Sequence, residues 1–250
     1  MTPSSPSNHG HPGKIRQMFG DVAPRYDLLN RIMSFGRDCF WRRCLTDRLL
    51  VLNSPGRFLD LATGTGDQLV CIKNRWPDAE ISGLDFSEPM LQEARNKMVR
   101  LRRKGKFQPP EPLFVCGDAL EPNLPENHFD SVSISFGLRN IPRREKLYET
   151  VWRLLKPGGR FLILELHFDP RSIWAPLHKF YLQSFIPFMA AGIFGSSQNA
   201  YRYLGESIMK FPHPDRLLDD LKKAGFVDLG RHQYTFGAAM LAWGHKPQPS

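Results

Sequence analysis

The sequence has few cysteines, and none of them form a C-x-x-C pair. Its four cysteines are scattered along the 250 residues, at Cys39, Cys44, Cys71 and Cys116. That spacing indicates neither a zinc site nor a disulfide framework, so no metal is expected. Reduced thiols of this kind fit a cytoplasmic protein.

Long apolar runs are also missing. The most apolar later stretch, residues 173–194, is interrupted by Pro176, Lys179 and Pro187. A membrane-spanning helix needs about 20 predominantly apolar residues, so this stretch is not expected to span a bilayer. Residues 1–13 are rich in Pro, Ser and Gly and have no apolar core of a signal peptide, which predicts a disordered tail.

Acidic residues are outnumbered, giving a formal net charge of +9. This balance favours acidic partners, either nucleic acid or an anionic membrane surface. Five of the seven residues 100–106 are Lys or Arg, at the predicted end of a helix. Because cations there are favourable to the helix dipole, we prefer this explanation of the cluster to a binding role.

Strand and helix patterns alternate along the middle of the chain. After a helical cover (14–52, with Gly36 as a breaker), strands are predicted at 58–61, 80–84, 112–116, 131–135 and 160–165, and helices at 67–75, 88–103 and 143–155. The strand at 160–165 is expected to follow a turn at residues 156–159. A helical insertion (170–210), a helix (214–224) and two edge strands (225–234 and 237–244) follow. Such βαβ units predict one α/β domain, residues 14–250, with a mostly parallel sheet covered by helices on both faces.

A glycine loop directly follows the first predicted strand, with Gly64 and Gly66 leading into a helix. Ligands of open parallel sheets bind at this edge, where glycine lets the backbone approach them closely. A dinucleotide fingerprint would need a third glycine, but Leu69 stands there. Asp60 in the strand would repel a pyrophosphate, whereas it would attract the ammonium of S-adenosylmethionine (SAM). The loop therefore favours SAM over a dinucleotide.

Polar residues also follow the next three strands. Asp85 ends the second strand about 20 residues on, where a carboxylate accepts hydrogen bonds from ribose hydroxyls. Asp118 and the N–H of Ala119 follow the third strand and suit an adenine ring, and Ser135 ends the fourth strand beneath the cofactor. Together these residues predict a nucleoside site.

Five further segments carry a narrower pattern. They are Met18-Phe-Gly-Asp-Val-Ala-Pro-Arg-Tyr-Asp-Leu-Leu-Asn30, Met33-Ser-Phe-Gly36, Ser135-Phe-Gly-Leu-Arg-Asn140, Leu155-Lys-Pro-Gly-Gly159 and Ala200-Tyr-Arg-Tyr-Leu-Gly-Glu-Ser-Ile208. With them the chain resembles the menaquinone/ubiquinone biosynthesis C-methyltransferases from residue 14 to residue 245. The resemblance implies a class I SAM-dependent methyltransferase fold, Rossmann-like, with a seven-stranded sheet.

The resemblance also implies a reaction, the transfer of a methyl group from SAM to a ring carbon of a polyprenylated quinol. Demethylmenaquinol is the favoured acceptor, and a methoxy-benzoquinol of ubiquinone synthesis is the alternative. The cofactor contacts of the family fall on Thr65, Asp85, Asp118, Ala119 and Ser135.

Roles in catalysis are hypotheses at this stage. We expect Arg139 to stabilise the phenolate, Asn140 and Tyr201 to orient the ring, and Tyr26 to close a lid. The alternative for Arg139 is a salt bridge that pins its loop. His167 is a second candidate base, although a surface histidine is the more common interpretation.

The remaining expectations concern binding partners and alternative functions. Aromatic residues of 173–194, with Phe35, Phe40 and Trp41, are interpreted as an apolar cover over the ring, or equally as core or a dimer interface. Peripheral contact with the inner face of the cytoplasmic membrane is expected, and the oligomeric state is left open. No N-P-P-[YF] motif is present, so a nucleic-acid methyltransferase is disfavoured. A non-catalytic protein that binds SAM and quinone is the rival from another class.

Overall fold

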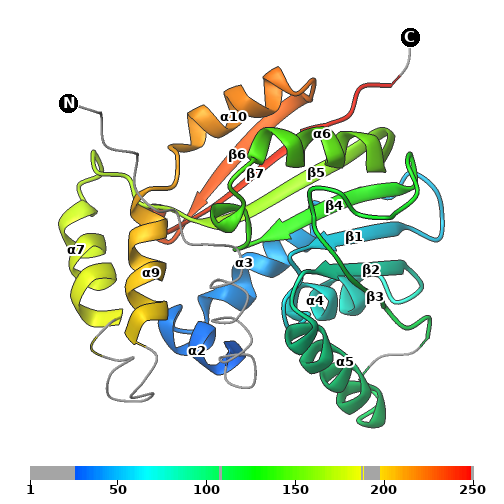
Figure 1. Ribbon diagram of the computed structural model, residues 1–250, viewed down its shortest axis with the longest axis horizontal. Helices are drawn as coiled ribbons and strands as arrows, with labels where there is room; N and C mark the ends of the chain where they lie inside the picture. The colour runs from blue at the N-terminus through cyan, green and yellow to red at the C-terminus, as the bar shows by residue number, and fades with distance from the viewer. Residues whose placement is uncertain (1–25, 107–108, 187, 189–197, 249–250) are drawn as a thin grey trace, which may run out of the picture.

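One seven-stranded sheet organises the molecule (Figure 1). The computed structural model describes residues 26–106, 109–186, 188 and 198–248. The strands are β1 (Arg57–Leu61), β2 (Glu80–Asp85), β3 (Leu113–Cys116), β4 (Phe129–Ser135), β5 (Leu155–Leu166), β6 (Val227–Tyr234) and β7 (Ala239–His245). Their order is β3-β2-β1-β4-β5-β7-β6; neighbouring strands from β3 to β5 are parallel, and β7 is antiparallel to both of its neighbours. The predicted α/β fold with a mostly parallel sheet is confirmed.

Helices cover both faces of this sheet (Figure 1). They are α2 (Tyr26–Met33), α3 (Arg37–Thr46), α4 (Asp67–Arg75), α5 (Glu88–Arg103), α6 (Arg144–Leu154), α7 (Ala175–Phe180), α9 (Gln198–Met209) and α10 (Pro214–Lys223), with short turns η2 (Leu138–Asn140), η3 (Tyr181–Phe185) and η4 (Thr235–Gly237). Successive side chains of a strand point to opposite faces, so β5 supplies Phe161 and Ile163 to one core and Leu162 and Leu164 to the other. Helices α6 and α10 close the first core, and α3 and α4 close the second.

Two sequence expectations about this sheet were wrong. β5 begins at Leu155 rather than after a turn, because the register against β4 jumps from Phe129–Leu155 to Ser131–Arg160. The intervening residues bulge within the strand, and Gly158 supplies the left-handed conformation (φ 77°) that this requires. β7 is not an edge strand but lies between β5 and β6, which explains why its residues Ala239–Ala242 are fully buried.

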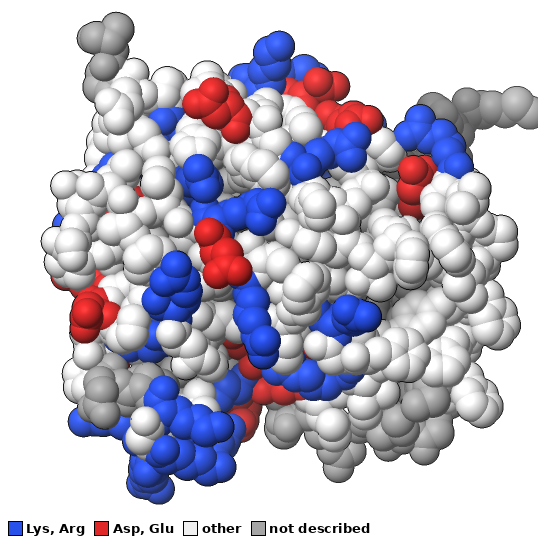
Figure 2. All heavy atoms as spheres, turned by 180° about the vertical axis from the view of Figure 1, so that it is seen from behind, with Lys and Arg blue, Asp and Glu red and all other residues white. Residues whose placement is uncertain are grey.

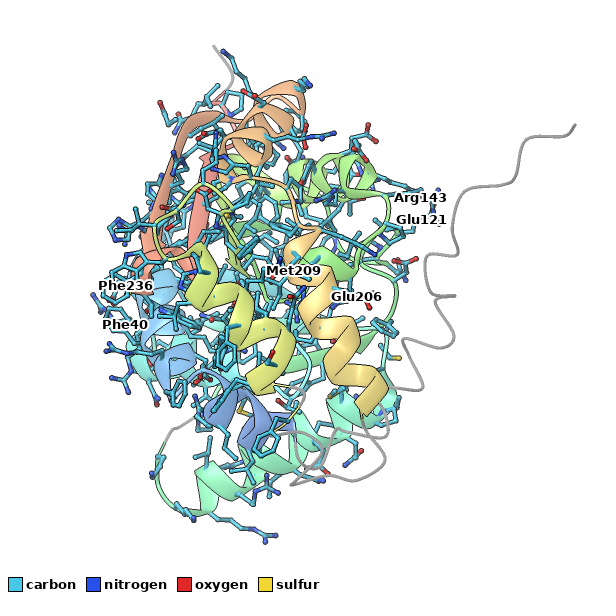
Figure 3. The ribbon with its side chains drawn as sticks, turned by 90° about the vertical axis from the view of Figure 1, so that its left-hand side faces the viewer. Phe40, Glu121, Arg143, Glu206, Met209 and Phe236 are labelled. Atoms are coloured by element: carbon cyan, nitrogen blue, oxygen red, sulfur yellow. The ribbon has the colours of Figure 1, made fainter. Side chains whose placement is uncertain are left out.

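A third apolar cluster lies where α2, η3 and α9 meet the end of β5. Leu182, Ile186 and Ile208 are its buried members, and Met33 and Leu166 pack against them. Figure 3 shows α7 and α9 side by side in front of the sheet. The predicted insertion is therefore helical and packed in its described part, whereas the predicted tail lies outside the described residues.

None of the described helices is both long enough and apolar enough to cross a bilayer.

Candidate active site

The glycine loop turns sharply between β1 and α4. Gly64 and Gly66 both have positive φ (55° and 78°), which favours glycine over residues with a Cβ. A Cβ added at Gly64 would meet no atom within 4 Å, whereas one at Gly66 would lie 3.2 Å from the Ala94 side chain. The surface at Gly64 therefore has room for a ligand against the backbone.

Asp85 is held rigidly beside this loop. Its carboxylate accepts hydrogen bonds from the backbone N–H of Gly64 (2.8 Å) and of Ser87 (2.9 Å), one on each oxygen. Burial raises the pKa of this carboxyl. A carboxylate has about four acceptor positions, so each oxygen keeps one for a further donor. This arrangement fits the two ribose hydroxyls of SAM.

Asp60 is more deeply buried than the sequence suggested. It is only 1 % exposed, and the Ser133 hydroxyl on β4 donates to its Oδ1 at 2.7 Å. Burial raises its pKa to about 6, although the bond from Ser133 lowers it. The role of Asp60 in attracting the ammonium of SAM stays a prediction.

The buried Asp60 gives a testable pH dependence. Its folded pKa of about 6 lies above its unfolded value of about 3.9, so folding favours the protonated form. Its contribution to stability is fully present below pH 4 and is lost as the pH rises through 6. Asp60→Asn should therefore stabilise the ligand-free protein increasingly over that range, by up to about 3 kcal/mol at neutral pH. Urea unfolding of both proteins at several pH values checks this, and a difference that stays constant with pH would contradict it.

The remaining predicted cofactor residues lie at the same sheet edge. Asp118 is exposed after β3 and accepts the Leu120 N–H at 2.8 Å, which orients its carboxylate beside Ala119. Ser135 is buried at the end of β4 and donates to Gln68 at 3.2 Å. One edge of the sheet thus carries the glycine loop together with Asp85, Asp118 and Ser135, as expected for residues that follow parallel strands.

A charged network ties the helical cover to this edge, and the sequence did not reveal it. The Thr65 hydroxyl donates to Asp27 of α2. Lys97 of α5 pairs with Asp27 (2.5 Å) and with Asp67 (2.6 Å), and Arg31 of α2 also pairs with Asp67 (3.3 Å). These contacts hold α2 over the glycine loop. No local sequence signal marks such pairs, because their members are about 30 to 70 residues apart or belong to different elements.

A pocket opens between the cover and the ends of β4 and β5. It encloses about 730 Å³, its open mouth included, and most of its lining is apolar. Contributors include Met33 and Trp41 from the N-terminal cover, Phe136 after β4, Leu182 from η3 and Ile208 from α9. The apolar lining suits an aromatic ring.

Arg139 and Glu165 form a buried ion pair at this pocket. Their side chains are 6 % and 0 % exposed, with Nη1 of Arg139 2.5 Å from Oε1 of Glu165. Nη1 also donates to the Phe136 carbonyl, and the backbone N–H of Arg139 donates to Glu165 Oε2 at 3.1 Å. The Nε of Arg139 is buried and has no partner among the described residues. The loop-pinning salt bridge thus exists, and the buried Nε–H takes no part in it.

The other predicted catalytic residues are placed less completely. Asn140 lies in η2 beside Arg139, where its N–H donates to Gly137. Tyr26 begins α2 and Tyr201 lies in α9, but their side chains are outside the described part of the structure. Their roles stay predictions.

His167 is not the surface residue that the sequence favoured. It follows β5, is 2 % exposed and lines the pocket together with Arg139. Its burial depends on the η4 turn about 70 residues later, which no pattern around residue 167 reveals.

Comparison with known protein families shows the family to which this chain belongs. The model of the ubiE/COQ5 methyltransferase family matches residues 8–246. The chain is 42% identical over 230 residues to a demethylmenaquinone methyltransferase of Thermus thermophilus, covering 92% of this chain and all of that protein. It is 36% identical over 234 residues to the ubiquinone/menaquinone biosynthesis C-methyltransferase UbiE of Geotalea daltonii, covering 93% and 96%.

A solved structure shares the fold at low identity. The phosphoethanolamine N-methyltransferase 2 of Haemonchus contortus, in complex with SAM, is 17% identical with a TM-score of 0.64, covering 92% of this chain and 60% of that one.

Proposed function

Because the chain belongs to the ubiE/COQ5 methyltransferase family, it is a SAM-dependent methyltransferase, and we propose that it methylates a ring carbon of demethylmenaquinol to form menaquinol. The observation that carries this proposal is the largely apolar pocket at the ends of β4 and β5, which is lined by Arg139, the partner of the buried Glu165. Relatives named demethylmenaquinone methyltransferase also have the higher identities, at 42% and 38%.

The proposed cofactor residues each supply one interaction. Asp85 accepts from the ribose hydroxyls, and Asp118 with the Ala119 N–H holds the adenine. Gly64 and Gly66 let the backbone approach, while Thr65 and Ser135 line the loop and the floor. The open space at Gly64 and the unused lone pairs of Asp85 fit the nucleoside. SAM itself supplies an electrophilic methyl group on a sulfonium.

The acceptor side needs an electron-rich carbon. A quinol becomes a carbon nucleophile when one hydroxyl loses its proton, and the enzyme must stabilise that negative charge. The Nε–H of Arg139 can donate to the phenolate oxygen, because it has no partner among the described residues while Nη1 is held by Glu165 and Phe136. Asn140, Tyr201 and Tyr26 are proposed to orient and cover the ring.

A direct assay tests the acceptor. The purified protein, labelled SAM and a short-chain demethylmenaquinol should give labelled menaquinol, and a methoxy-benzoquinol should give at most slow turnover. Faster methylation of the benzoquinol would move the function to ubiquinone synthesis. Binding of SAM without turnover of either quinol would favour the non-catalytic alternative.

A peripheral contact with an anionic membrane is the second part of this proposal. Large apolar side chains are exposed around the pocket and along α7, namely Phe35 (72 %), Ile173 (87 %), Leu177 (58 %), Phe180 (61 %) and Phe236 (67 %). Figure 3 shows Phe236 beside Phe40 at the same side as α7. Exposed apolar side chains gathered on one side of a protein are typical of a contact with protein or lipid.

Charge contributes less to this contact than the net charge suggested. The basic end of α5, with Arg100, Arg102 and Arg103, lies at lower left in Figure 2, away from the α7 side, which carries few charged side chains. Among the described residues, Lys179 of α7 and Arg171 just before it are the nearby cations that can face a membrane together with α7. Each well-placed cation adds about 1 kcal/mol near an anionic surface.

Vesicle flotation measures this association. The protein should float with phosphatidylglycerol vesicles, and raised ionic strength should weaken the binding. The double variant Ile173→Ser/Phe180→Ser should lose most of it, because two exposed side chains no longer enter the interface. Val99→Ser, on the distant α5, is the matched control at 45 % exposure. Equal binding by the double variant and this control would contradict the proposed face.

A further inference from the structure

Two buried nitrogens of residues that line the pocket have no hydrogen-bond partner in the described part of the chain. Seven buried side-chain polar atoms of the described residues lack one, and among these Arg139 Nε and His167 Nε2 belong to residues that line the pocket. A buried polar atom without a partner is destabilising, so such atoms mark places where a ligand completes the bonding. The Nε–H of Arg139 is a hydrogen-bond donor. Nε2 of His167 donates or accepts according to which ring nitrogen carries the proton.

The η4 turn decides which nitrogen of His167 carries that proton. Nδ1 lies 3.3 Å from the Gly237 carbonyl, which can only accept, so Nδ1 is the protonated nitrogen. The backbone N–H of His167 donates to the Ala238 carbonyl at 3.0 Å, which fixes the residue against the same corner. Nε2 on the opposite side of the ring therefore carries a lone pair.

Other ionisable groups of the pocket are unsuited to take a proton. Asp38 is paired with Arg31 (2.5 Å) and accepts from Ser34. Tyr181 donates its hydroxyl proton to the Met33 carbonyl, and burial raises its pKa to about 12.

Glu165 is also committed. Its two oxygens accept from Nη1 and the backbone N–H of Arg139, and from the N–H of Leu166 at 2.9 Å. His178 is the remaining rival, on the outer helix α7. Within the described residues, no hydrogen bond fixes its tautomer as Gly237 fixes that of His167.

We propose that His167 is the general base of the reaction and that its Nε2 removes the proton from the quinol hydroxyl next to the reacting carbon. This inference rests on the proposed quinol methylation. Arg139 Nε–H then stabilises the oxygen that loses the proton, so the two unpartnered nitrogens act on the acceptor together.

The proton and electron movements balance. The hydroxyl proton moves to Nε2; the ring carbon forms a bond to the methyl group as the carbon–sulfur bond breaks and its electrons pass to sulfur. The methylated carbon then loses its hydrogen to water, and the ring oxygen takes the proton back from Nε2. One proton is released per turnover, and neutral His167 is regenerated.

The surroundings keep His167 neutral at working pH. Burial lowers its pKa, the bond to Gly237 raises it, and the nearby His213 lowers it. Asp169 raises it and Arg231 lowers it; Arg139 lines the same pocket and is paired with the buried Glu165. The ring is therefore unprotonated at neutral pH, and turnover should fall only below about pH 6.5.

Substitution gives the first test. His167→Gln should lower single-turnover methyl transfer about 100-fold at neutral pH, with unchanged SAM affinity and unfolding temperature. The exposed His232→Gln on β6 is the matched control and should keep full activity. The deficit of His167→Gln should shrink about tenfold per pH unit toward a phenol pKa of about 10, because more quinol is then already ionised. A purely structural defect would not shrink in this way.

Nuclear magnetic resonance gives a second test that needs no turnover. Long-range ¹H–¹⁵N spectra of the native protein should show His167 as the Nδ1–H tautomer. An Nε2–H tautomer, turnover of His167→Gln within about threefold of native, or a pH-dependent deficit in His178→Gln instead would overturn the assignment. If the native enzyme fails to methylate demethylmenaquinol, the proposed function fails, and the tautomer still reports on His167.

Discussion

Arg139→Ala is expected to lower methyl transfer about 1,000-fold while leaving SAM affinity unchanged. Among the described residues of the pocket lining, this guanidinium is the one cation that reaches the end of β4. Removal of a donor to a developing oxyanion costs about 10²–10³ in rate. The same substitution leaves Glu165, which is fully buried, without its partner. Breaking a buried pair on one side costs about 3–5 kcal/mol, so the variant should also unfold at lower denaturant. Single-turnover kinetics and urea unfolding measure the two effects.

Two further variants separate the loss of methyl transfer from the loss of stability. Arg139→Met/Glu165→Gln removes both charges and should restore most of the stability without restoring turnover. Lys156→Ala breaks another largely buried pair, with Asp130 (2.6 Å; Asp130 0 % exposed), far from the pocket. It should lower stability and leave the rate of the remaining folded protein unchanged. If the double variant regains turnover, Arg139 acts only by pinning its loop.

Asp85→Ala is expected to weaken SAM binding about 100- to 1,000-fold. The substitution removes the acceptor of the ribose hydroxyls, and hydrogen bonds to a charged group are worth about 1.5–3 kcal/mol each. It also leaves the N–H groups of Gly64 and Ser87 without their acceptor, so the glycine loop loses the contact that orients it. Isothermal titration calorimetry with SAM measures the dissociation constant.

Glu80→Ala is the matched control for Asp85. It removes a carboxylate from the opposite end of the same strand, where Glu80 is exposed and pairs with Arg57 at 2.8 Å. Exposed ion pairs contribute at most about 1 kcal/mol, so SAM affinity and stability should change little. An Asp85→Ala affinity within about fivefold of native would exclude the proposed ribose contact.

The sequence by itself determined most of the fold and which strand ends carry the candidate site residues. Local periodicity predicted α4 and α5 with the bounds that the structure shows, because a helix or buried strand is specified by residues within a few positions of one another. Gly64, Gly66 and Asp85 were candidates for the same reason, since strand ends in one parallel sheet share an edge. The bulge in β5 and the interior place of β7 were missed, because both depend on pairing between strands that are distant in the chain.

The tertiary structure alone decided how the side chains are used. Arg139 meets Glu165 26 residues away, and His167 meets Gly237 70 residues away. Hydrogen bonds act over about 3 Å, whereas sequence patterns report only on neighbours along the chain. Pairing, burial and the fixed tautomer of His167 therefore could not be read from the sequence, and these contacts distinguish a paired arginine and a buried base from two ordinary polar residues after strands.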